Sequence, residues 1–104
     1  MTTYLNPTTL NATTESIISE EDVELLKAMA HPIRLRIIKE LCKQQSFNVT
    51  QLTEMLNLPQ STVSQHLAKM RGKIVKAERK GIEMYYYVAN LNASKIIKIL
   101  GYLD

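Results

Sequence analysis

The hydrophobic residues of this chain change their spacing twice, and that change limits the folds that the chain can adopt. Across residues 20–70 they recur at intervals of three and four, as on one face of a helix. Between Ile74 and Val88 the spacing becomes alternating, which is typical of strands, with Gly81 in a turn. From Asn90 onward the helical spacing returns. The sequence therefore predicts a mainly α-helical fold with one small β-hairpin.

Capping residues and helix breakers divide the helical regions into separate elements. Ser19 with Asp22 is a side-chain pair of the kind that closes a helix N-terminus. Asn48 with Gln51 is a second such pair, and Pro32 suits a first helical turn because it has no N–H to leave unpaired. Together with the remaining breaks, these signals predict helices near residues 19–30, 32–45, 48–57, 60–71 and 90–104, and strands at 74–79 and 82–88 around a Lys80-Gly81 turn.

The chain is expected to form one folded domain preceded by an arm. Residues 1–18 contain six threonines and little apolar periodicity, so we interpret them as a flexible N-terminal arm. Residues 19–104 are too few for two independent cores. No apolar run approaches the roughly 20 residues of a membrane-spanning helix, and the N-terminus resembles no secretory signal. We therefore expect a cytoplasmic protein.

The charge is distributed unevenly along the chain. The formal net charge is only +3. Residues 1–30 hold five acidic side chains and one basic one, whereas residues 60–81 hold six basic side chains and one acidic one, a net of +5. Such a stretch is as typical of a solvated surface as of a surface that binds an anion, so its position in the fold must decide between the two.

The basic stretch begins in the second helix of a pair joined by a tight turn, an arrangement that places a helix in the major groove of DNA. At about 100° per residue, Val63, Leu67 and Met70 fall on one side of this helix and short polar side chains on the other. Glutamine and hydroxyl groups on that side can hydrogen-bond to base edges, while the nearby cations can contact phosphates. The alternative is an ordinary amphipathic helix with a charged rim. The predicted DNA-binding residues are Gln60, Ser61, Thr62, Ser64, Gln65, His66, Lys69, Arg71, Lys73, Arg79 and Lys80.

Two segments of this region resemble a known family. Residues 26–38, LKAMAHPIRLRII, resemble the opening of the ArsR/SmtB winged helix-turn-helix repressors, and residues 58–67, LPQSTVSQHL, are similar to their recognition helix. Gly81 with Tyr85-Tyr86-Tyr87 resembles their wing. The resemblance implies a homodimeric repressor that binds a pseudopalindromic operator in double-stranded DNA. It also implies a dimer interface between the first and last helices, formed here by Val23, Leu26, Ile96, Ile97, Leu100 and Leu103.

The sensing residues of that family are not matched. Metal-sensing members place cysteines on the helix that corresponds to residues 48–58, or Asp and His ligands on the last helix, and neither set is present here. Thiol-switch members use two cysteines, whereas this chain has only Cys42. We therefore expect no metal and no cofactor. No catalytic set of side chains can be assembled either, so we expect no enzyme.

Several alternatives remain at this stage. The same fold can serve as a protein-interaction regulator, or as a metal- or redox-responsive repressor with an unusual site. Cys42 is expected to pack in the core, with an intermolecular disulfide or a reactive thiol as the alternative. His31 is expected to cap or pack at a helix start rather than to bind a metal. His66 fits a packing role and a phosphate contact equally well.

Overall fold

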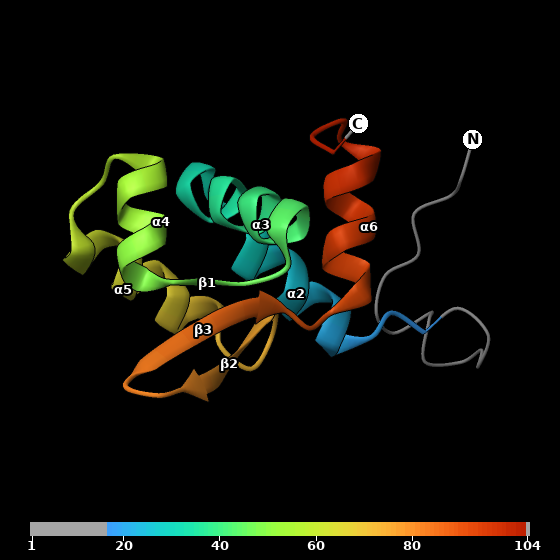
Figure 1. The fold of residues 1–104 in the computed structure, drawn as a ribbon. Helices are drawn as coiled ribbons and strands as arrows, with labels where there is room; N and C mark the ends of the chain where they lie inside the picture. Colours follow the sequence, from blue (N-terminus) through green and yellow to red (C-terminus); the bar gives the residue numbers. More distant parts are fainter. Residues whose placement is uncertain (1–16, 104) are drawn as a thin grey trace.

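The computed structural model describes residues 17–103, and Figure 1 shows the order of its elements. They are α2 (Glu20–Met29), α3 (Pro32–Gln44), β1 (Phe47–Asn48), α4 (Val49–Leu56), α5 (Gln60–Met70), β2 (Val75–Lys80), β3 (Glu83–Val88) and α6 (Leu91–Ile99). The structure confirms the predicted fold, mainly α-helical with a β-hairpin. Most of the predicted arm, residues 1–16, lies outside the described residues.

Side-chain caps fix where most of the helices begin. Ser19 Oγ accepts a hydrogen bond from the N–H of Glu21 at 3.0 Å, one residue earlier than a capping box with Asp22 would require. Asn48 and Gln51 form the predicted capping box, with bonds of 2.8 and 2.9 Å. His31 Nδ1 accepts from the N–H of Ile33 at 3.0 Å, which confirms its predicted capping role at α3. The helix boundaries are therefore set largely by local sequence.

The sheet has three antiparallel strands in the order β1-β3-β2, one more than the sequence predicts. Phe47 of β1 pairs with Tyr86 of β3, so the segment interpreted as a helix break is also a short edge strand. The hairpin turn is shifted by one residue from its predicted position. Lys80 pairs with Glu83, which leaves Gly81 and the following residue as a two-residue loop. Gly81 has a φ of +66°, a conformation that glycine adopts without steric strain.

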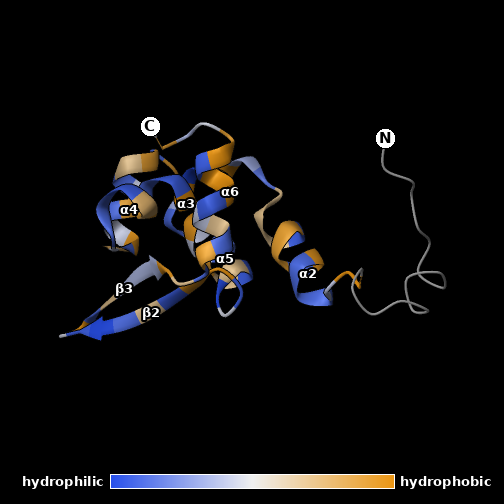
Figure 2. Cartoon of the chain, turned by 90° about the vertical axis from the view of Figure 1, so that its right-hand side faces the viewer, coloured by the Kyte–Doolittle hydropathy of each residue, from blue (hydrophilic) through white to orange (hydrophobic). Residues whose placement is uncertain are grey.

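The core lies where α3, α4, α5 and the start of the sheet meet. Each of these helices contributes fully buried side chains, among them Ile37, Leu52 and Leu67. Helix α2 buries Leu25, Ala28 and Met29 and lies to one side of this body in Figure 2. No helix between residues 17 and 103 is long and apolar enough to cross a membrane.

Helix α6 packs on α3 through one face only. Ala93 and Ile97 are fully buried, whereas Ile99 is 82% exposed and Leu100 is 53% exposed. Ile97 therefore belongs to the core of its own chain, which corrects its predicted place in a dimer interface. The helix also ends at Ile99 rather than continuing to the C-terminus, and Gly101 follows with a φ of +90°.

Candidate nucleic-acid interface

Helix α5 has the two faces that the sequence predicts. Val63, Leu67 and Met70 are fully buried against the other helices. The opposite face carries short polar side chains and one lysine, and no acidic or bulky apolar residue interrupts it. Its exposed members are Gln60, Ser61, Ser64, Gln65, Ala68 and Lys69, with Thr62 half-buried at the edge. A face of this composition can enter a groove closely and offer donors and acceptors to base edges.

The N-terminus of α5 is the part of this face with the most unused hydrogen-bonding capacity. Pro59 occupies the N-cap position and no side chain accepts a hydrogen bond from the first-turn N–H groups. These N–H groups lie at the positive end of the helix dipole, where phosphate oxygens are favourable partners.

The turn before α5 is held by contacts from two helices. Asn57 adopts a left-handed conformation, with a φ of +56°, and ends α4. Arg36 of α3 donates from Nη2 to the carbonyl oxygen of Leu56 at 3.2 Å, and the N–H of Leu58 donates to the carbonyl of Thr53 at 3.2 Å. The carbonyl groups of Thr53 and Leu56 in the last turn of α4 are therefore paired, and this pairing holds the turn that leads into α5.

Basic side chains gather beyond the other end of α5. The predicted phosphate contacts Lys69, Arg71 and Lys73 are all exposed. They line a surface hollow of about 320 Å³ together with Lys27 of α2 and Arg34 of α3. The structure thus adds two cations to the predicted set. Their positions in the sequence, 30 or more residues before this end of α5, gave no local signal that they would join it.

The β-hairpin carries two further predicted residues. Arg79 and Lys80 are exposed at the end of β2, and Lys80 Nζ lies 5.3 Å from the centre of the Tyr85 ring. Tyr86 faces the opposite way and packs against the core. The hairpin therefore has a rigid base and a basic tip. Ile82 at the tip is 88% exposed and is not among the predicted residues.

His66 lies beside the exposed polar residues of α5 but packs inward. Its Nδ1 accepts a hydrogen bond from Arg34 Nε at 3.3 Å, and its ring centre lies 4.3 Å from that of His31. Burial, followed by the positive charges of His31, Arg34 and Lys69, lowers the pKa of His66 below its ordinary value. Of the two predicted roles, the described contacts favour packing over a phosphate contact.

The side chains around these histidines do not form a metal site. Both Nδ1 atoms already accept hydrogen bonds, from Ile33 N–H and from Arg34 Nε, and the guanidinium would repel a cation. Among residues 17–103 no three His, Cys, Asp or Glu side chains cluster as ligands would. Cys42 is half-buried against the core, and burial raises the pKa of its thiol. That environment disfavours the reactive thiolate.

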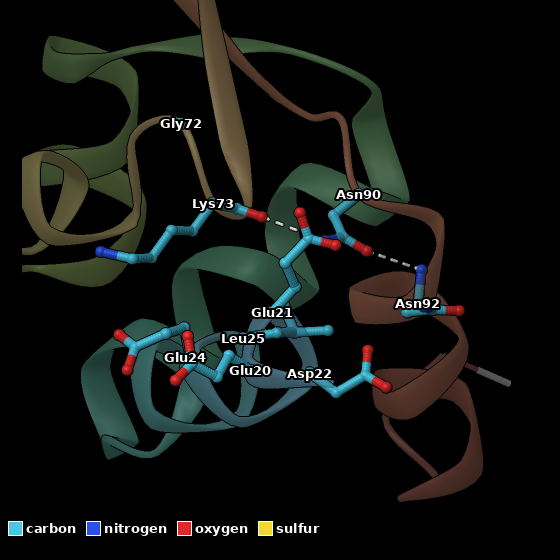
Figure 3. A pocket seen from close by; sticks show the side chains of 9 residues that line it. All are labelled: Glu20, Glu21, Asp22, Glu24, Leu25, Gly72, Lys73, Asn90 and Asn92. Atoms are coloured by element: carbon cyan, nitrogen blue, oxygen red, sulfur yellow. Dashed lines mark hydrogen bonds between the residues drawn. The ribbon is translucent and has the colours of Figure 1, made fainter. Parts of the chain in front are cut away.

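An acidic hollow of about 510 Å³ lies between α2 and the start of α6 (Figure 3). Its α2 side carries the carboxylates of Glu20, Glu21, Asp22 and Glu24. On the other side Asn90 donates from Nδ2 to the carbonyl oxygen of Lys73 at 3.1 Å. These carboxylates would repel phosphates, so within residues 17–103 the surface best suited to nucleic acid consists of α5, the basic residues around its end and the hairpin.

The predicted interface residues on α2 and α6 differ in their exposure. Val23, Leu26 and Leu100 are exposed, and Ile96 and Leu103 are half-buried against the core. Ile99 and Tyr102, which are not among the predicted interface residues, add exposed apolar surface.

Comparisons with known proteins agree with this geometry. Residues 31–73 match the family described as bacterial regulatory protein, arsR family. The chain is 58% identical over 82 residues to the transcriptional repressor PagR of Bacillus anthracis, covering 79% of this chain and 83% of that protein. It is 38% identical over 88 residues to the nodulation protein NolR of Rhizobium meliloti, covering 81% of this chain and 70% of that protein.

Solved structures show the same relationship. The crystal structure of PagR superposes with a TM-score of 0.77 at 57% identity, covering 79% of this chain and 94% of PagR. HlyU from Vibrio cholerae superposes with a TM-score of 0.71 at 33% identity, covering 77% of this chain and 87% of HlyU. The polar face of α5, the basic hairpin and these similarities lead to one assignment. The chain belongs to the ArsR family of bacterial regulatory proteins, a family of winged helix-turn-helix transcription regulators and not of enzymes.

Proposed function

We propose that this protein represses transcription by binding a specific, pseudopalindromic site in double-stranded DNA as a homodimer, in the cytoplasm and without metal sensing. The observation that carries the proposal is the outward face of α5. It is polar, exposed and free of acidic groups, while the inner face of the same helix is fully buried. A rigidly held helix with such a face is suited to reading base edges in a major groove.

The cations around this face support DNA as the partner. Lys69 lies in the last turn of α5, Arg71 and Lys73 follow its end, and Arg79 and Lys80 lie near the hairpin tip. In the proposed complex they contact phosphates on either side of the groove that α5 occupies. Such contacts supply affinity and register, whereas the face of α5 supplies discrimination between sequences.

The homodimer is supported by the surface that α2 and α6 leave uncovered. Leu26 is 54% exposed on α2, and Ile99, Leu100 and Tyr102 are exposed at the end of α6. Large apolar side chains of this kind are usual where a second subunit packs. Two copies related by a two-fold axis would present two recognition helices, which accounts for the proposed symmetry of the site.

Selection of bound duplexes from a random DNA pool by the purified protein tests the proposal. A preferred sequence should emerge, and Gln65→Ala combined with Ser61→Ala should weaken its binding by about 10- to 100-fold because base-edge hydrogen bonds are lost. Gln44→Ala, at an exposed glutamine at the end of α3, serves as the matched control. Unchanged binding by the double variant would refute the assigned readout. Recovery of a stable protein partner with no preferred DNA would instead favour the protein-interaction alternative.

The hairpin should behave differently from α5. Arg79→Gln with Lys80→Gln should weaken binding to all sequences alike and lower the slope of log affinity against log salt by about 2, since about 0.9 is lost per phosphate contact. The comparison is with Lys39→Gln and Lys43→Gln, which remove the same charge from α3. A change in the preferred sequence without a change in slope would contradict the phosphate role.

A further inference from the structure

One arginine joins three helices in this structure. Arg34 of α3 donates from Nη1 to the carbonyl oxygen of Ala28, in the last turn of α2, at 3.1 Å. It also donates from Nε to Nδ1 of His66, in the middle of α5, at 3.3 Å. Only a guanidinium has a fork of donors that can reach both acceptors at once.

The histidine that Arg34 contacts is in turn packed on another histidine. The rings of His66 and His31 lie 4.3 Å apart at an angle of 45°. His31 is fixed because its Nδ1 caps α3 by accepting from the Ile33 N–H. His66 is therefore held from two sides, and its Nδ1 must keep a lone pair to accept the bond from Arg34.

We propose that Arg34 is a positioning residue for the recognition helix, that it acts through neutral His66, and that DNA sequence discrimination weakens when His66 gains a proton. This inference rests on the proposed DNA-binding function. His66 directly follows Gln65, one of the residues assigned to base readout. A loss of the bond at His66 removes a tie between α5 and α3 next to that residue, and displacements of about 1 Å are enough to spoil hydrogen bonds to base edges.

The charged groups around His66 explain why a proton would release it. Arg34 and His31 face it from α3, and Lys69 lies near it on α5. The one carboxylate in the adjoining hollow, Glu24 of α2, pairs with Lys27 at 3.7 Å. A proton on Nδ1 removes the acceptor and adds a positive charge beside cations. The lowered pKa of His66 agrees with this arrangement.

The test is the ratio of the affinity for the selected DNA site to the affinity for unrelated DNA, measured at about pH 7.5 and about pH 5.5. The ratio cancels the general gain in DNA affinity that any protein shows when it becomes more positive. For the unaltered protein we expect it to fall as His66 gains its proton, by about tenfold once protonation is complete, the effect of losing about one hydrogen bond to a charged group. His66→Asn keeps an acceptor near the position of Nδ1 but does not titrate, so its ratio should stay the same at both pH values.

Variants of Arg34 separate positioning from simple charge. Arg34→Lys keeps the positive charge but loses the fork, so we expect an about tenfold lower ratio at neutral pH with unrelated DNA bound as before. Arg34→Gln should lower the affinity ratio to the same degree and should also bind all DNA more weakly. Lys43→Gln, an exposed cation on the same helix, is the control for charge alone. If Arg34→Lys behaves like the unaltered protein, Arg34 is only a cation and the inference is wrong.

A readout without DNA checks the histidine itself. Because the folded state lowers the pKa of His66, the unfolded state binds its proton more readily. The stability from this group is complete above the ordinary value of about 6.5 and is lost as the pH falls through the lower folded value. Thermal unfolding should show this loss in the unaltered protein and not in His66→Asn, which also tests the inference if the Arg34 variants fail to fold.

The outcomes distinguish this inference from the proposed function. An unaltered protein with no preferred DNA site at neutral pH overturns the proposed function, and the inference with it. A preferred site whose ratio is equal at both pH values overturns the inference alone. A ratio that falls as steeply in His66→Asn as in the unaltered protein also overturns it, because another group then carries the pH dependence.

Discussion

Helices α4 and α5 are neighbours, yet the polar groups at their ends are paired in different ways. The N-terminus of α4 is closed by the capping box of Asn48 and Gln51, and its C-terminal carbonyl at Leu56 is bound by Arg36. The N-terminus of α5 begins at Pro59 with no side-chain cap. Polar groups at both ends of α4 are thus paired within the chain, whereas α5 leaves its first N–H groups available to a partner.

The capping of its ends thus helps to distinguish a helix that supports the fold, such as α4, from one that is suited to bind a partner, such as α5. A helix that only supports others is most stable when its ends are capped, and each cap contributes about 1 kcal/mol. Helix α5 forgoes that contribution at its first turn and is held instead along its side, by its buried face and by the bond from Arg34 to His66. The predictions that follow alter one helix end at a time.

The largest effect is expected from closing the open end of α5. Pro59 has the extended conformation of an ordinary N-cap, with φ −61° and ψ 147°, so Pro59→Asp should place a carboxylate over the first-turn N–H groups. In the proposed complex the added negative charge repels phosphates, and DNA affinity should fall about tenfold or more for all sequences. Fluorescence anisotropy with selected and unrelated duplexes measures this.

Pro59→Asn separates the two causes of that loss. Asparagine provides a cap of the same shape without the charge, so its DNA affinity should lie between those of Pro59→Asp and the unaltered protein. Equal DNA affinity in all three proteins would show that the open end of α5 plays no part in binding.

A smaller effect is expected from opening the closed end of α4. Asn48→Ala removes the side-chain oxygen that accepts the hydrogen bond from the Gln51 N–H, and should lower the free energy of unfolding by about 1 kcal/mol. Urea denaturation measures the loss, with Glu54→Ala at an exposed position of α4 as the control. The preferred DNA sequence should not change. A changed sequence preference with unaltered stability would mean that α4, not α5, carries the readout.

Features that depend on neighbouring residues in the sequence were predicted well. The caps at Ser19, His31 and Asn48 and the buried side of α5 follow from spacings of a few residues, and the structure confirms them. The turn of the hairpin was wrong by one residue, because both Lys80-Gly81 and the observed loop place glycine at a position that allows a positive φ. Only the pairing of Lys80 with Glu83 decides between them.

Features that depend on distant residues were missed. β1 has two residues, too few to show an alternating pattern, and it is a strand only because Phe47 meets Tyr86 across the fold. The bond from Arg34 to His66 joins residues 32 positions apart, so no local spacing announces it. Ile97 was assigned to a dimer interface from the resemblance to the family, and neither that resemblance nor periodicity says which part of a wide apolar face meets the chain's own core.

The short strand β1 fixes the position of the hairpin relative to α4 and α5. Asn48 pairs with Tyr85 of the hairpin and, in the same residue, caps the helix that leads into α5. Asn48 therefore links the hairpin directly to the helix pair that includes α5. In the proposed complex the hairpin tip and α5 contact the duplex at a fixed separation. The protein therefore senses the local width of the duplex as well as the bases that it touches.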